Sequence, residues 1–158
     1  MKTATSEKTS SQPRLNYAAA APATLQAMLA LVEAVKHGGL DEILLYLVET
    51  RASQINGCGF CIDMHIRAAK AAGQPDERLY LLDAWRDVDI YSPRERAALR
   101  WTELLTRLTE NEITEADFAA ARREFSEAEL SHLTLAIVTI NGWNRFNVAF
   151  RMPPRFGG

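Results

Sequence analysis

The sequence predicts an all-α protein of six or seven helices, and three observations support that fold class. Apolar side chains recur at i, i+3 and i+4 spacing, first between residues 23 and 37. Residues that favour helix starts precede several such segments. No segment alternates between apolar and polar residues as a half-buried strand does, and the β-branched run 136–140 lies inside a helical period. These patterns leave no sheet to compete with the helices.

Three helices are expected in the N-terminal half of the chain. The first covers residues 23–37 and ends at the glycines that follow, because glycine readily adopts the conformation that stops a helix. Asp41 is a candidate N-cap for the second helix, which ends at Asn56–Gly57. The third helix begins near Cys58 and continues to Gly73.

Start signals are clearer in the C-terminal half. A helical segment restarts after Pro75. Ser92 is followed by a proline and, at the third helical position, a glutamate, which together predict a capping box. Thr114 opens a shorter helix, and Ser126 repeats the capping-box pattern before a long apolar helix that ends before Pro153.

The composition is that of an ordinary globular protein, and the length predicts one domain. Of the 158 residues, 47% are hydrophobic and 24% charged, so we expect one domain over residues 13–158 behind a disordered tail of residues 1–12. A net charge of −2 argues against nucleic acid as a partner, because phosphate binding requires a basic surface. No membrane span or signal peptide is recognisable, which predicts a cytoplasmic location. In that reducing compartment a cysteine pair is typical of redox catalysis, redox sensing or metal binding.

Both cysteines lie in the segment NGCGFCIDMH, residues 56–65. On one helix, Cys58, Cys61 and His65 occupy positions i, i+3 and i+7, which share a face. The first turn favours a thiolate, because its backbone N–H groups are unpaired, and it lowers a thiol pKa from about 8.5 toward about 7.5. His65 is expected within hydrogen-bond reach of Cys61, where it can hold or relay a proton. Since an oxidised sulfur can condense with its neighbour into a disulfide, the three groups suffice for a dithiol peroxidase cycle.

Less specific roles fit the same residues. A Cys-x-x-Cys pair at a helix start can also be structural or incidental. Two cysteines and one histidine could bind zinc, but a closed zinc site needs four ligands and an open site needs three. The other histidines, His37 and His132, are distant in the sequence. We therefore expect neither a metal nor another cofactor.

The motif and its flanking segments resemble the AhpD-like branch of the carboxymuconolactone decarboxylase superfamily. Residues 51–65, RASQINGCGFCIDMH, are similar to the core motif of that family. Residues 14–22, 92–106 and 133–154 resemble further segments of its short, single-domain members. The resemblance implies the AhpD-like helical fold and reduction of hydroperoxides by the cysteine pair. It also implies subunits that assemble into trimers or hexamers.

The resemblance assigns a role to each residue of the motif. Cys61 corresponds to the peroxidatic cysteine, Cys58 to the resolving cysteine and His65 to the histidine that relays protons. The family usually has a glutamate twelve residues before the first cysteine, where this chain has Tyr46. Glu49, one helical turn nearer the motif on the same face, either reaches His65 directly or through one water, or is a solvated surface acid. The phenol of Tyr46 could offer a hydrogen bond, but its ordinary pKa of about 10 makes it a poor base.

Two functional hypotheses use these residues. The first is an enzyme, a thiol-dependent alkyl hydroperoxide reductase of antioxidant defence that takes a hydroperoxide as substrate and a thiol protein or small thiol as reductant. The second is a non-enzymatic or very slow redox sensor or assembly module, in which disulfide formation changes packing or partner binding. The same residues serve both functions, so the sequence leaves both open. Neither requires a nucleic acid or a membrane.

Overall fold

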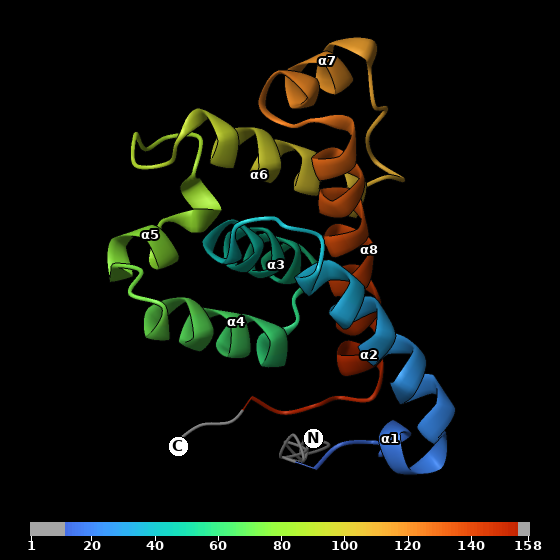
Figure 1. Ribbon diagram of the computed structural model, residues 1–158. Helices are drawn as coiled ribbons and strands as arrows, with labels where there is room; N and C mark the ends of the chain where they lie inside the picture. Colours follow the sequence, from blue (N-terminus) through green and yellow to red (C-terminus); the bar gives the residue numbers. More distant parts are fainter. Residues whose placement is uncertain (1–11, 155–158) are drawn as a thin grey trace, which may run out of the picture.

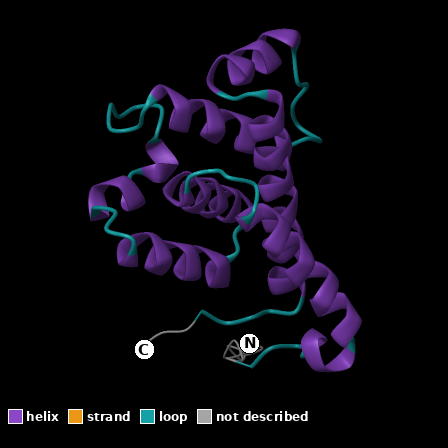
Figure 2. Ribbon diagram, in the orientation of Figure 1, coloured by secondary structure: helices purple, strands orange, loops and turns teal. Residues whose placement is uncertain are grey.

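The computed structural model describes residues 12–154, and within that range every regular element is helical (Figure 2). The all-α prediction is therefore confirmed. Residues 1–11 lie outside the described part, so the predicted tail, residues 1–12, and the domain boundary at residue 13 stay predictions. The elements are α1 (Tyr17–Ala20), α2 (Pro22–Lys36), α3 (Glu42–Asn56), α4 (Gly59–Ala71), α5 (Asp76–Tyr80), the 3₁₀ helix η1 (Leu82–Ala84), α6 (Pro93–Thr106), α7 (Glu115–Glu124) and α8 (Glu127–Ala149).

The predicted helix starts are confirmed where a side chain caps the helix. Asp41 Oδ1 accepts the N–H of Leu44 at 3.1 Å, at the start of α3. Ser92 and Ser126 form the predicted capping boxes of α6 and α8, and Thr114 forms a third at α7. The described range holds eight α-helices rather than six or seven, because α1 is only four residues long and has no period to read. The segment after Pro75 also divides into α5 and η1.

Helix α3 lies at the centre of the molecule, with α4, α6 and α8 around it (Figure 1). One side of α3 enters the largest core cluster through Leu44 and Val48, which pack with residues of α6, α7 and α8. Another side carries Leu47 into a second cluster with η1 and α6. The helix that leads into the cysteine motif is therefore held by apolar contacts along most of its length.

The N-terminal segment lies against the C-terminal end of α8. The backbone N–H of Arg14 donates to the carbonyl of Phe150 at 2.8 Å. The Tyr17 ring lies 5.1 Å from the ring of Phe146 and 5.7 Å from that of Phe150, between centroids. The N-terminal segment of the described chain therefore lies beside the last turns of α8, where the C-terminal segment leaves that helix (Figure 1). None of the helices in residues 12–154 has the length and apolarity that a membrane span requires.

Candidate functional site

The turn between α3 and α4 sets the position of the cysteine motif. Gly57 follows the last residue of α3 with φ 67° and ψ 31°, a left-handed conformation that glycine adopts without strain. Its N–H donates to the carbonyl of Gln54 at 3.2 Å, and the N–H of Cys58 donates to that of Ser53 at 3.0 Å. This pair of bonds is a Schellman motif, which ends α3 and leaves Cys58 as the cap of the next helix.

Cys58 and Cys61 are joined by a disulfide in the first turn of α4. Cys58 is the N-cap, and its Sγ accepts the backbone N–H of Cys61 at 3.3 Å. Both residues are buried, with exposed fractions of 2% and 0%. This placement agrees with the prediction that both sulfurs lie at the helix start. The backbone N–H that the cap uses, that of Cys61, is directed at the sulfur of Cys58.

His65 is paired with Glu49, the acid one turn nearer the motif than the usual family position. His65 Nδ1 lies 3.0 Å from Glu49 Oε2, and both side chains are largely buried, 11% and 20% exposed. A neutral imidazole that donates its Nδ1–H to the carboxylate carries its lone pair on Nε2. That Nε2 atom is buried and has no hydrogen-bond partner within the described residues.

No hydrogen bond joins His65 to Cys61 in this disulfide-bonded form, so the expected reach of His65 to the Cys61 thiol stays a prediction. Two contacts account for the absence of this bond. Glu49 draws the Nδ1 edge of the imidazole toward α3. The sulfur of Cys61 is bonded to Cys58 and accepts a hydrogen bond from elsewhere, the Nδ2 group of Asn147 at 3.3 Å.

Tyr46 occupies the usual glutamate position but is directed away from the motif. Its hydroxyl donates to the carboxylate of Glu42, one turn earlier on α3. The hydrogen bond to Glu42 and, next, burial raise the pKa of Tyr46 to about 12. A phenol that holds its proton this firmly is not a base near neutral pH, so Glu49 is the acid that the fold brings to His65.

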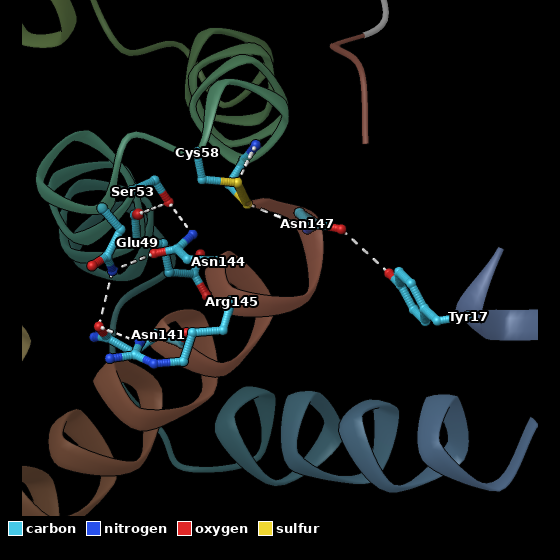
Figure 3. Close-up of a disulfide and its surroundings, with 10 residues drawn as sticks. Tyr17, Glu49, Ser53, Cys58, Asn141, Asn144, Arg145 and Asn147 are labelled. Carbon is cyan, nitrogen blue, oxygen red and sulfur yellow. Dashed lines mark hydrogen bonds between the residues drawn. A yellow bond between two sulfur atoms is a disulfide. The ribbon is translucent and has the colours of Figure 1, made fainter. Parts of the chain in front are cut away.

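Asn147 and Tyr17 were not singled out from the sequence, yet Asn147 contacts the disulfide and Tyr17 contacts Asn147 (Figure 3). The Oδ1 atom of Asn147 accepts the hydroxyl hydrogen of Tyr17 at 3.3 Å, opposite the bond to Cys61. One signal was available: asparagines at 141, 144 and 147 fall on one face of an otherwise apolar helix. Buried amides at helical spacing indicate a polar contact with another element.

An apolar cavity of about 500 Å³ lies between α2, α3, α4 and α8. Leucine, valine and aromatic side chains form most of its wall. The polar part of the wall includes His65, Glu49 and Asn147, whereas neither cysteine lines it. A molecule in the cavity would therefore meet the neighbours of Cys61 first, and it would be held mainly by its apolar surface.

Within residues 12–154, no group of three or more histidine, cysteine, aspartate or glutamate side chains is arranged to hold a metal ion. The two sulfurs are engaged with each other, and one nitrogen of His65 is engaged with Glu49. The expectation that the protein uses no metal or other cofactor stays a prediction.

The comparisons with known proteins agree with the fold and the motif. The sequence profile of the carboxymuconolactone decarboxylase family matches residues 22–104. The uncharacterised protein YdfG of Bacillus subtilis (strain 168) is 35% identical over 136 residues, which span 86% of this chain and 92% of the relative.

Solved structures show the same arrangement of helices. A protein of unknown function from Agrobacterium tumefaciens, provisionally assigned as the antioxidant defence protein AhpD, aligns with a TM-score of 0.89 and 36% identity over 92% of this chain and 100% of that one. The debrominase Bmp8 in complex with 2,3,4-tribromopyrrole aligns with a TM-score of 0.78 at 17% identity, over 87% of this chain and 74% of that one. The second likeness shows a shared fold alone. The chain belongs to the carboxymuconolactone decarboxylase family, in its AhpD-like branch.

Proposed function

We propose that this protein is a thiol-dependent alkyl hydroperoxidase that reduces organic hydroperoxides to alcohols. The observation that carries the proposal is the Cys58–Cys61 pair at the start of α4, with the His65–Glu49 pair beside it on the wall of an apolar cavity. The two sulfurs lie within one helical turn, so forming the disulfide requires no second element to move toward the first. The apolar wall favours a hydroperoxide with a hydrocarbon body.

The proposed cycle has three balanced steps. The Cys61 thiolate attacks one oxygen of the hydroperoxide, so that an S–O bond forms, the O–O bond breaks and an alkoxide leaves and takes up a proton. The Cys58 thiolate then attacks the sulfur of the resulting sulfenic acid, forming the disulfide and expelling hydroxide, which is protonated to water. A dithiol reductant returns both thiols by exchange and is itself oxidised to a disulfide.

His65 manages the protons in this scheme. With Nδ1–H held by Glu49, Nε2 is the nitrogen left to accept the Cys61 thiol proton and later return it to the leaving alkoxide. Since no hydrogen bond joins Nε2 to Cys61 in the disulfide form, this transfer belongs to the reduced form or passes through a bridging water. Because no residue in the range 12–154 bonds Nε2, this nitrogen is available to exchange a proton as the sulfur changes state.

A single-turnover experiment tests the proposal. The fully reduced protein is mixed with one equivalent of cumene hydroperoxide, and intact mass and free thiols are followed with time. We expect loss of two hydrogens and of both thiols within seconds, and a slower reaction with hydrogen peroxide, which has no apolar body to bind the cavity. Thiols that survive for many minutes would contradict a peroxidase and favour the slow redox sensor.

Replacement of Glu49 by glutamine tests the proton-handling pair. The amide no longer holds the imidazole as a carboxylate does, so we expect the rate of Cys61 oxidation to fall by about 10- to 100-fold. Asp63→Asn is the matched control, because Asp63 is a nearby acid that pairs with Arg67 at 2.9 Å instead of with His65. Stopped-flow peroxide kinetics measure both variants, and equal rates in the two would remove Glu49 from the mechanism.

The wider setting of the proposed activity rests on the resemblance and the sequence. A thiol protein or small thiol as reductant, assembly into trimers or hexamers, and a cytoplasmic location remain predictions. Size-exclusion chromatography with light scattering measures the assembly directly.

A further inference from the structure

Helix α8 presents three asparagines toward α3 and α4, and they make different contacts. Asn141 and Asn144 both accept hydrogen bonds from Asn56 Nδ2 at 2.9 Å, and Asn144 Nδ2 donates to Ser53. These two side chains fasten α8 to α3 (Figure 3). Asn147, one turn further, instead donates to a reacting sulfur.

We propose that Asn147 stabilises the Cys61 thiolate through its Nδ2–H group and that Tyr17 is the positioning residue that holds this amide in place. The inference rests on the proposed function only in taking Cys61 as the nucleophile. Asn147 is 4% exposed, and its Nδ2 lies 3.3 Å from Cys61 Sγ. A thiolate only accepts hydrogen bonds, so a buried donor at this distance acts more strongly on the thiolate than on the thiol.

The second contact of the amide fixes its orientation. If the amide were flipped, its oxygen would face the thiolate, and two electron-rich atoms would repel each other. With Nδ2 toward Cys61, Oδ1 of Asn147 faces Tyr17, which donates its hydroxyl hydrogen at 3.3 Å. Burial raises the pKa of Tyr17, so the phenol keeps the proton that it donates. Contacts with the rings of Phe146 and Phe150 hold the tyrosine against α8.

The same geometry distinguishes the two cysteines. The backbone N–H at the start of α4 is directed at the sulfur of Cys58, so the helix terminus by itself favours charge on the resolving cysteine. The side-chain donor of Asn147 is directed at Cys61. The hydrogen bond from Asn147 therefore favours negative charge on Cys61, whereas the helix terminus favours it on Cys58.

Thiol titration in a single-cysteine background tests the inference. Cys58→Ser leaves Cys61 as the sole thiol and keeps a good N-cap, because serine is among the favoured capping residues. The ultraviolet absorbance of the thiolate gives the pKa of Cys61 without a reagent that must reach a buried sulfur. Adding Asn147→Leu, which keeps the branched shape but has no donor, should raise this pKa by about 1–2 units, a 10- to 100-fold loss of thiolate.

Two further variants separate this role from a structural one. Tyr17→Phe removes one hydroxyl from a half-buried ring and should raise the Cys61 pKa by a smaller amount. This rise corresponds to a loss of thiolate of about threefold. Asn141→Leu, the same exchange six residues earlier on α8, should leave the pKa unchanged although it removes hydrogen bonds to Asn56 and Thr106.

The outcomes decide the inference independently of peroxide turnover. An unchanged pKa in Asn147→Leu, or an equal rise in Asn141→Leu, would overturn the role of Asn147. If Asn147→Leu does not fold, Tyr17→Phe decides, because an unchanged pKa in a folded Tyr17→Phe variant would overturn the chain from Tyr17 to Cys61. A wild-type protein without peroxidase activity would contradict the proposed function and leave these titrations valid.

Discussion

Cys61→Ser is expected to reduce hydroperoxide consumption to the uncatalysed background, whereas Cys58→Ser is expected to react once and stop. The nucleophile in thiol chemistry is the thiolate, and a serine hydroxyl at the same position does not ionise near neutral pH. Without Cys58, the Cys61 sulfenic acid has no partner for the disulfide. Intact mass should therefore show one added oxygen in Cys58→Ser and no change in Cys61→Ser after one equivalent of cumene hydroperoxide.

The two variants control for each other, because each removes one buried sulfur from the same turn and prevents the disulfide. Thermal unfolding of both proteins checks that the fold is retained. If a sulfenic acid instead accumulates in Cys61→Ser, Cys58 is the peroxidatic cysteine and Cys61 the resolving one. It would also mean that the helix terminus at Cys58, rather than the side chain of Asn147, selects the nucleophile.

Local features of this fold could be predicted from the sequence because their partners are close along the chain. The Ser126 cap contacts the backbone of Glu129, three residues away, and the Asp41 cap contacts that of Leu44. The position of Cys58 and Cys61 in the first turn of α4 is local in the same sense. Spacing alone predicts such contacts, since one helical turn brings residues three or four apart together.

Contacts between distant segments could not be predicted in this way. Asn147 lies 86 residues from Cys61 and 130 from Tyr17, and these contacts exist only because α8 crosses α4 and the N-terminal segment lies on α8. The orientation of the His65 ring could not be predicted from residue spacing either. The helical period fixed its distance from Cys61 along the axis, but the direction of its ring depends on Glu49 of the neighbouring helix.

A large loss of stability is expected when Glu103 is replaced. This residue lies in a buried ionic cluster with Arg51 of α3. Its carboxylate accepts Arg51 Nε at 2.8 Å, Trp85 Nε1 at 2.8 Å and an Arg86 nitrogen at 2.6 Å, although only 5% of the residue is exposed. Arg51 is the first residue of the motif segment 51–65 and also pairs with Asp83. The cluster therefore ties the second half of α3 to α6 and to the segment that follows η1.

Glu103→Gln is expected to destabilise the protein by about 3–5 kcal/mol near neutral pH, because it removes the buried carboxylate that pairs with Arg51 and leaves that guanidinium only the exposed Asp83. Glu127→Gln is the matched control, since Glu127 is 89% exposed in its pair with Arg122 and a surface ion pair contributes little. Urea denaturation measures the free energy of unfolding of both variants. Equal losses in the two would show that the cluster contributes no more than a surface pair.

The pH dependence gives a second measurement of the same carboxylate. Burial alone would raise the pKa of Glu103, but hydrogen bonds from Arg86, Trp85 and Arg51 outweigh it and lower the pKa from 4.5 to about 2. A lowered pKa in the folded state stabilises the protein above the unfolded value of 4.5, and this stabilisation is lost as the pH falls from 4.5 toward 2. The wild-type protein should lose about 3 kcal/mol from this group over that interval. The glutamine variant has no such group to protonate. The stability difference between the two proteins should therefore shrink at acidic pH. A difference that stays constant would mean that Glu103 titrates normally in the folded protein.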